Sequence, residues 1–188
     1  MKTISLPLSI SFIVIALVTG IAIGYIATPE YRQNMYASAR MDLGPADRWI
    51  DERYITAMIA HHRGAILVAE QASKNATRSE IKNLAAEILA NEPKLIAELY
   101  SWKKDWYGNE RKVKDPIVPN LGVSDNTFDL RFLNAVISHH EAGIMMTKEV
   151  RLKSTRSEIL NNADAVEQFL VGGITMLKGW RASWYSIQ

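Results

Sequence analysis

Apolar residues fall in a helical pattern along two long stretches of the chain. Between positions 50 and 73 they recur three and four residues apart, for example at Met58 and Ile59 after Tyr54 and Ile55. This spacing places them on one face of an α-helix and does not fit the alternation of a strand. A second stretch with the same period runs from position 81 to 107, so the pattern predicts two consecutive helices.

The same pattern returns in the second half of the chain. Residues 51–107 align with residues 129–185 without a gap, at a constant offset of 78 positions (129 minus 51). Such self-similarity is the signature of an internal duplication. The copied positions include every histidine of the chain: His61, His62, His139 and His140.

Two helical hairpins follow from this duplication, one over residues 47–107 and the other over 125–188. Residues 108–124 between them are rich in proline, glycine and asparagine and predict a loop-like linker. Each copy also has Thr-x-x-Glu, at 77–80 and 155–158, which predicts a capping box at the start of its second helix. The simplest way to bury both apolar faces is an all-α, ferritin-like four-helix bundle.

The amino-terminal region has a different character. Residues 6–27 carry no charge, and 22 residues at about 1.5 Å each are long enough to cross the ~30 Å hydrocarbon layer of a membrane. We therefore expect residues 1–28 to be a transmembrane anchor, with a cleaved signal as the alternative, and residues 29–46 to be a tether. Lys2 on the short side favours a single-pass protein of the plasma membrane with its carboxy-terminal domain outside the cytoplasm, on the periplasmic side.

Composition excludes several kinds of function. The chain has 48% hydrophobic and 22% charged residues, as folded proteins do, and a net charge of only +2 without a basic stripe, so no nucleic-acid partner is expected. It has no cysteine, which rules out disulfides and thiolate ligands. The Glu-x-x-His motif of di-iron bundles and the His-Glu-x-x-His motif of zinc peptidases are both absent, so we expect a protein that is not an enzyme.

The histidine pairs are the best candidates for chemistry. A rotation of 100° per residue places His62 and His140 on the apolar stripes of their helices, whereas His61 and His139 lie at the flanks and face a groove. Neighbouring histidines on one helix diverge, so one pair rarely closes a site, but two facing pairs can. Neutral imidazole is a common metal ligand, and its combination with thioether suits copper. The predicted metal ligands are His61, His62, His139, His140, Met146, Met58 and Met145.

Several alternatives stay open at this point. Imidazole together with the carboxylate of Glu141 would suit Cu(II) or zinc. The histidines could instead be structural in a non-catalytic scaffold or interaction domain, or they could charge near pH 6 and loosen the bundle. The sequence also leaves open whether the two copies pair within one chain or between the chains of a homo-oligomer.

The doubled motif resembles a known family. His-His is followed by small, apolar and methionine positions. An aspartate precedes the motif, and a helix that ends in tryptophan follows it. This pattern is similar to the bacterial "domain of unknown function 305" family over residues 51–185. The resemblance implies a helical bundle outside the cytoplasm that binds copper for sequestration or transfer. The histidines and Met146 match the motif, Val68 replaces its methionine in the first copy, and Glu92 and Leu170 stand where the family has glutamine.

Overall fold

The computed structural model describes residues 42–187, and the regular structure in that range is entirely helical. The four helices are α3 (Ile50–Asn75), α4 (Ser79–Tyr107), α5 (Phe128–Arg151) and α6 (Ser157–Tyr185). The predicted all-α class is therefore confirmed for this range. No helix within it is long and apolar enough to cross a membrane, and the predicted span at 6–27 lies outside the described residues.

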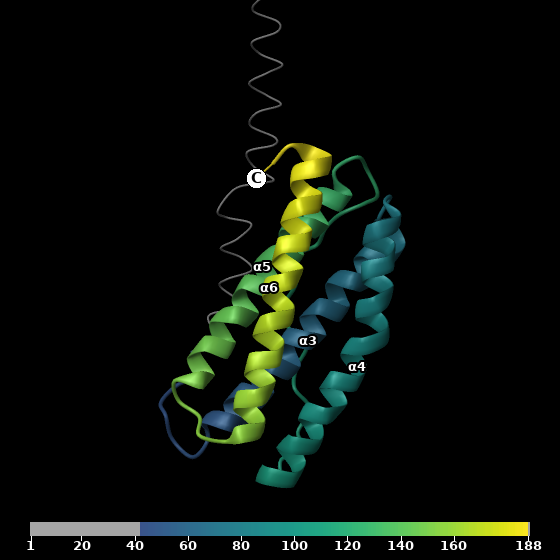
Figure 1. The fold of residues 1–188 in the computed structure, drawn as a ribbon. Helices are drawn as coiled ribbons and strands as arrows, with labels where there is room; N and C mark the ends of the chain where they lie inside the picture. The colour runs from purple at the N-terminus through teal and green to yellow at the C-terminus, as the bar shows by residue number, and fades with distance from the viewer. Residues whose placement is uncertain (1–41, 188) are drawn as a thin grey trace, which may run out of the picture.

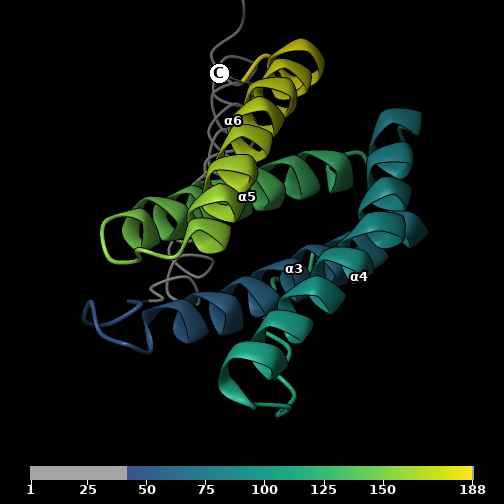
Figure 2. The same cartoon turned by 60° about the horizontal axis from the view of Figure 1, so that its bottom comes forward.

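The helices form two hairpins that pack through their first helices. α3 pairs with α4, α5 pairs with α6, and α3 contacts α5 across the middle of the molecule (Figure 1). By contrast, α4 and α6 make almost no contact with each other and diverge in Figure 2. The predicted all-α fold of four helices is thus confirmed, but it differs from a ferritin-like bundle in the space between the two outer helices.

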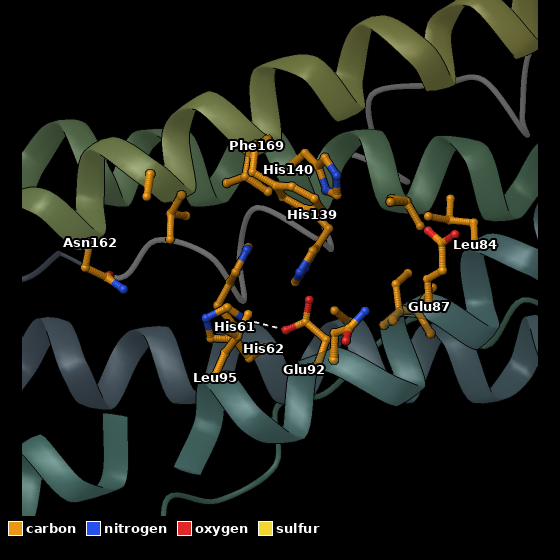
Figure 3. A pocket seen from close by; sticks show the side chains of 18 of the residues that line it. His61, His62, Leu84, Glu87, Glu92, Leu95, His139, His140, Asn162 and Phe169 are labelled. Carbon is orange, nitrogen blue, oxygen red and sulfur yellow. Dashed lines mark hydrogen bonds and ion pairs between the residues drawn. The ribbon is translucent and has the colours of Figure 1, made fainter. Parts of the chain in front are cut away.

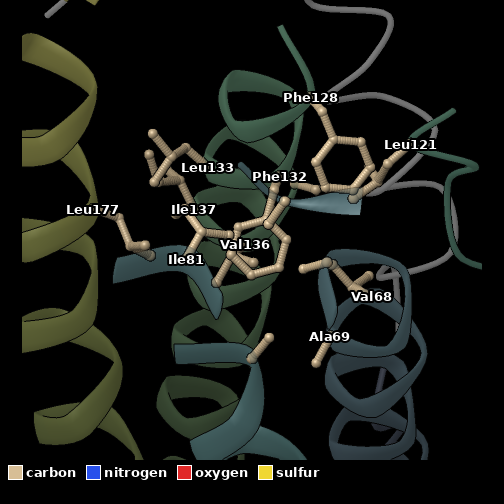
Figure 4. Packing of buried hydrophobic residues seen from close by; sticks show 14 residues of the cluster. Val68, Ala69, Ile81, Leu121, Phe128, Phe132, Leu133, Val136, Ile137 and Leu177 are labelled. Atoms are coloured by element: carbon tan, nitrogen blue, oxygen red, sulfur yellow. The ribbon is translucent and has the colours of Figure 1, made fainter. Parts of the chain in front are cut away.

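Two apolar clusters hold the hairpins together, one on each side of the α3–α5 crossing. The first core joins the carboxy-terminal part of α3 to the start of α5, and the start of α4 to the end of α6 (Figure 4). The second core joins the start of α3 to the end of α5, and the end of α4 to the start of α6. Their fully buried large side chains include Phe128, Phe132 and Leu133 in the first core and Tyr54, Ile55 and Met58 in the second.

A duplicated aspartate ties each hairpin to the other. Asp129 of α5 accepts hydrogen bonds from Thr77 N (3.0 Å), Thr77 Oγ1 (2.5 Å) and Arg78 N (2.9 Å) in the turn before α4. Its copy, Asp51 of α3, accepts one from Ser154 Oγ (2.6 Å) in the turn before α6. Negative charge therefore lies at the start of each second helix, where the free N–H groups and the helix dipole favour it.

The predicted capping boxes are wrong. α4 is preceded by Arg78 and α6 by Arg156, and neither helix start has a side-chain cap within the described range. The hydroxyl of Thr77 donates to Asp129 instead. A carboxylate from the opposite hairpin forms a stronger hydrogen bond than a local hydroxyl, so the tertiary contact replaces the local motif.

Cation–π contacts also link the two hairpins, one at each end of the molecule. The guanidinium of Arg78 lies 4.3 Å from the ring centroid of Trp184, and that of Arg156 lies 4.2 Å from Trp106. Each arginine precedes the second helix of one hairpin and covers a tryptophan near the end of the other. Such pairs stabilise by about 0.5–1 kcal/mol at exposed sites.

The structural repeat begins before the sequence repeat. Leu43 N donates to Glu149 Oε1 on α5 (3.0 Å), and Leu121 N donates to Gln71 Oε1 on α3 (2.7 Å), so equivalent leucines 78 positions apart attach to the opposite hairpin. Both leucine side chains are buried. Residues 42–46, which the sequence assigned to the tether, therefore belong to the folded unit.

The remaining connections agree with the sequence. Residues 108–124 contain no helix or strand, and Gly108 ends α4 in the left-handed conformation with φ +61°. α4 continues through Pro93 as one helix and changes direction near its middle in Figure 2. Proline removes one backbone hydrogen bond and crowds the preceding turn, which accounts for such a bend.

Candidate metal centre

A cavity of about 440 Å³ lies between the two cores, and all four helices line it. Its existence follows from the separation of α4 and α6, since the middle of α4 has no neighbour on α6 to pack against. Most of the lining is aliphatic or aromatic, with Leu95 and Phe169 partly exposed at 42% and 67%. The polar exceptions include four imidazoles, Glu92, Glu87 and Glu98 (Figure 3).

All four histidines reach this cavity, as the sequence predicted for facing pairs. The rings of His61 from α3 and His139 from α5 stack with centroids 3.8 Å apart and planes 5° from parallel. His62 and His140 point away from this stack, toward α4 and α6 respectively. The two histidines of a pair have similar exposure, buried in the first pair and partly buried in the second. The expectation of one core and one groove histidine per pair is therefore wrong.

Glycines make this stack fit between the helices. A Cβ atom at Gly143 of α5 would lie 2.8 Å from His61 Nε2, and one at Gly64 of α3 would lie 3.4 Å from His139 Cε1. Each imidazole therefore rests against the backbone of the opposite helix where that helix has no side chain. At Gly143 this close approach is a reason for glycine inside a helix that would otherwise favour alanine, whereas the distance at Gly64 is an ordinary contact.

The two outward histidines differ in their partners. His62 Nδ1 pairs with a carboxylate oxygen of Glu92 on α4 (Figure 3). The equivalent of Glu92 in the second copy is Leu170 (92 plus 78), and the ring of His140 lies against Gly173 instead. Within residues 42–187, His140 Nδ1 is buried without a hydrogen-bond partner. Duplication therefore produced two pairs with different surroundings.

Burial keeps three of these imidazoles uncharged at neutral pH. Desolvation, followed by the other nearby histidines, holds the pKa of His61 well below 6.5. Desolvation is also the main cause that lowers the pKa of His139 to about 3, and it lowers the pKa of His140 to about 4. A neutral imidazole has a free lone pair, which is the form that binds a metal ion.

The predicted methionine ligands lie elsewhere. Met58 and Met146 are buried in the second core and are not part of the cavity lining, whereas Met145 is 59% exposed. The Glu141 carboxylate, the alternative hard ligand, lies 3.8 Å from Lys178 Nζ. The structure thus brings the four histidines together and leaves the three methionines outside the cavity, and their role as ligands stays a prediction.

Sequence reasoning missed Glu92 as a partner of the histidines. The signal was present, because a helical register of three and four residues per turn puts Glu92, Leu95 and Leu99 on one face of α4, and Leu99 is buried. What the sequence could not reveal is that this face of α4 meets His62.

The donors fit a metal ion chemically, but they are not arranged as a finished coordination sphere. Among the described residues, no group of three or more His, Asp or Glu side chains is placed so that it could hold an ion. Because the side chains do not converge on one point, binding of an ion requires rotation of at least one ring. The cavity beside the rings gives space for that rotation. Nδ1 of His140 has no hydrogen-bond partner among the described residues and is therefore available as a ligand atom.

Fold and site together define an all-α protein of two crossed helical hairpins with a buried histidine cluster at the crossing. The model of the family "Domain of unknown function (DUF305)" matches residues 51–127. Solved structures of CopM match across nearly their whole length at up to 30% identity, so the chain belongs to this family.

Three CopM structures illustrate the similarity. "CopM in the Cu(I)-bound form" has a TM-score of 0.65 and 28% identity, and the match covers 73% of this chain and 99% of that one. "CopM in the Ag-bound form (by soaking)" has a TM-score of 0.64 and 30% identity, and the match covers 73% of this chain and 99% of that one. "CopM in the Cu(II)-bound form" has a TM-score of 0.61 and 27% identity, and the match covers 72% of this chain and 97% of that one. No curated protein matches the chain.

Proposed function

We propose that this protein binds copper through its two histidine pairs and sequesters the ion or transfers it to another protein, without catalysing a reaction. The observation that carries the proposal is the convergence of all four histidines, two from each hairpin, on one cavity. The low pKa values of His61, His139 and His140 support it, because neutral imidazoles bind metal without first losing a proton. The similarity to CopM, whose solved structures include Ag-, Cu(I)- and Cu(II)-bound forms, supports the choice of copper.

We also propose that the protein acts outside the cytoplasm as a single-pass protein of the plasma membrane. The support is the uncharged run at 6–27 with Lys2 before it. Fusion of a reporter enzyme to the carboxy terminus tests this, since alkaline phosphatase becomes active only outside the cytoplasm. Activity of a cytoplasmic reporter at the same position would contradict it.

Isothermal titration of the full-length protein in detergent tests copper binding. Cu(II), Ag(I) as a redox-inert substitute for Cu(I), and Zn(II) are each titrated into the native protein and into a variant with all four histidines replaced by alanine. We expect saturable copper binding that the variant lacks. Equal weak binding by both proteins would contradict the proposal, and tighter binding of zinc than of copper would contradict the choice of metal.

One observation favours a second function, a scaffold with structural histidines. His61 and His139 stack at the helix crossing, where they pack against Gly143 and Gly64 as core residues do. This alternative predicts that replacing the stacked pair lowers the melting temperature and leaves the response to metal unchanged. The same titrations, accompanied by thermal melts, separate the two functions.

A further inference from the structure

Glu92 is the feature that distinguishes the two halves of the histidine cluster. Its side chain is 13% exposed, and its carboxylate pairs with His62 Nδ1 inside the cavity. In the second half the corresponding residue is Leu170, and His140 Nδ1 has no partner among the described residues. One half therefore has a largely buried carboxylate that pairs with its histidine, and the other does not.

The carboxylate sets the orientation of His62. An ionised carboxylate can only accept hydrogen bonds, so Nδ1 of His62 donates and its lone pair is left on Nε2. Carboxylate–histidine pairs of this kind hold a metal-binding ring in one tautomer and raise its basicity. His140 lacks such a partner among the described residues, and its ring packs against Gly173, Phe169 and His139.

The same carboxylate also changes the character of the cavity. Its second oxygen points toward His139 in the view of Figure 3, on the side where the histidines meet. The lining thus offers imidazole nitrogen and carboxylate oxygen, and it includes no thioether, since Met58 and Met146 lie in the second core. Nitrogen and oxygen donors suit divalent copper, whereas thioether sulfur suits Cu(I).

On the basis of the proposed function, we propose that Glu92 determines metal specificity: it orients His62 and makes the site prefer Cu(II) to monovalent ions. A buried negative charge attracts a divalent cation about twice as strongly as a monovalent one at the same distance. The preference therefore comes from the first half of the molecule, at a position where the second half has an apolar side chain.

The test compares Glu92→Gln with the native full-length protein in detergent. Glutamine has nearly the same shape, and its carbonyl oxygen still accepts from His62 Nδ1–H, so the change removes the charge and keeps the orientation. We expect the dissociation constant for Cu(II) to rise about 10- to 100-fold, the usual range for changing a carboxylate partner of a ligand. The constant for Ag(I) should rise less, by roughly the square root of that factor, about 3- to 10-fold, because its charge is half as large. The electron paramagnetic resonance spectrum of bound Cu(II) should change as well.

Two further variants make the outcome specific. Glu92→Leu copies the second half and should weaken Ag(I) binding further than Glu92→Gln does, because it also removes the orientation of His62. Glu87→Gln neutralises an exposed carboxylate on the same wall of the cavity and should leave both constants unchanged. Thermal melts of each variant establish that it is folded before titration.

The outcomes separate this inference from the proposed function. If Glu92→Gln binds Cu(II) as tightly as the native protein, or loses Cu(II) and Ag(I) equally, the specificity role is overturned while copper binding stands. An equal loss in Glu87→Gln would show a general effect of charge and would also overturn it. If the native protein binds no better than the variant without histidines, the proposed function itself fails.

Discussion

Adjacent glycines on α6 offer a direct test of the packing around the histidine cluster. A Cβ atom added at Gly173 would lie 2.6 Å from Nε2 and 2.7 Å from Cδ2 of His140, whereas one added at Gly172 would have nothing within 4 Å. Ordinary contacts of a Cβ atom begin near 3.4 Å. The imidazole of His140 would thus have to retreat by roughly 0.8 Å in a packed site, where overpacking destabilises by about 1–3 kcal/mol.

The expected magnitudes follow from two opposing effects. Replacing glycine by alanine inside a helix stabilises by about 1 kcal/mol. Gly172→Ala should show this gain in full. Gly173→Ala should show the gain minus the overpacking cost, which leaves it about 1–3 kcal/mol less stable than Gly172→Ala. For a domain of this size the difference corresponds to roughly 2–4 °C in melting temperature for each kcal/mol.

Urea unfolding of the two variants, followed by circular dichroism, measures the difference. A second pair made in the His140→Ala background identifies its cause, since the three atoms nearest to a Cβ at Gly173 belong to that ring. Without the ring, Gly173→Ala should stabilise as much as Gly172→Ala does. Equal stabilisation in the native background would refute the close approach of His140 to α6, and an unchanged cost in the His140→Ala background would refute its assignment to the ring.

Three further predictions test the hydrogen bonds of Asp129 between the hairpins, the buried imidazoles and the methionines. Asp129→Ala leaves two backbone N–H groups before α4 without their acceptor and should lower the free energy of unfolding by about 2–4 kcal/mol in urea titrations, whereas the exposed Asp125→Ala should have a much smaller effect. Because burial holds the pKa of His139 near 3 and that of His140 near 4, below the 6.5 of the unfolded chain, the unfolded state binds more protons in this window. The free energy of unfolding should therefore be constant above about pH 7.5 and fall as the pH falls from 6.5 toward 4. The slope should reach up to about 1.4 kcal/mol per pH unit for each imidazole. A constant free energy of unfolding across that window would contradict the burial of these imidazoles in neutral form. Met58→Leu conserves core volume, so it should cost less than about 1.5 kcal/mol in the same unfolding assay and leave the copper affinity unchanged in titrations; a loss of affinity in the folded variant would make Met58 a ligand.

The features that could be predicted from the sequence are those that depend on local periodicity and on the duplication. Apolar spacing around Met58 and Ile59 was sufficient for a helix, because a helix places residues three and four apart on one face whatever its surroundings. The offset of 78 residues was sufficient to expect that His61 and His139 occupy equivalent places, and the structure confirms that the two pairs face each other.

Other features depend on contacts between distant residues, and local reasoning failed there. Thr77 belongs to a sequence pattern for a capping box, yet its hydroxyl donates to Asp129, 52 positions away. Leu43 looked like part of a tether, yet its backbone N–H donates to Glu149 on α5. In both cases a side chain from the opposite hairpin satisfies a backbone or hydroxyl group, and no local pattern shows which distant acceptor is near.

The sequence by itself determined the helices, their pairing into two equivalent hairpins and the residues able to bind a metal, because periodicity and duplication are properties of the chain. Only the tertiary structure decided that α4 and α6 stay apart, that a cavity opens between them, and that Glu92 reaches His62 while His140 meets Gly173. The physical reason is that duplicated helices contact different side chains once the two hairpins have packed together. The difference between Glu92 and Leu170 gives the histidine of one half a carboxylate partner that its duplicate lacks.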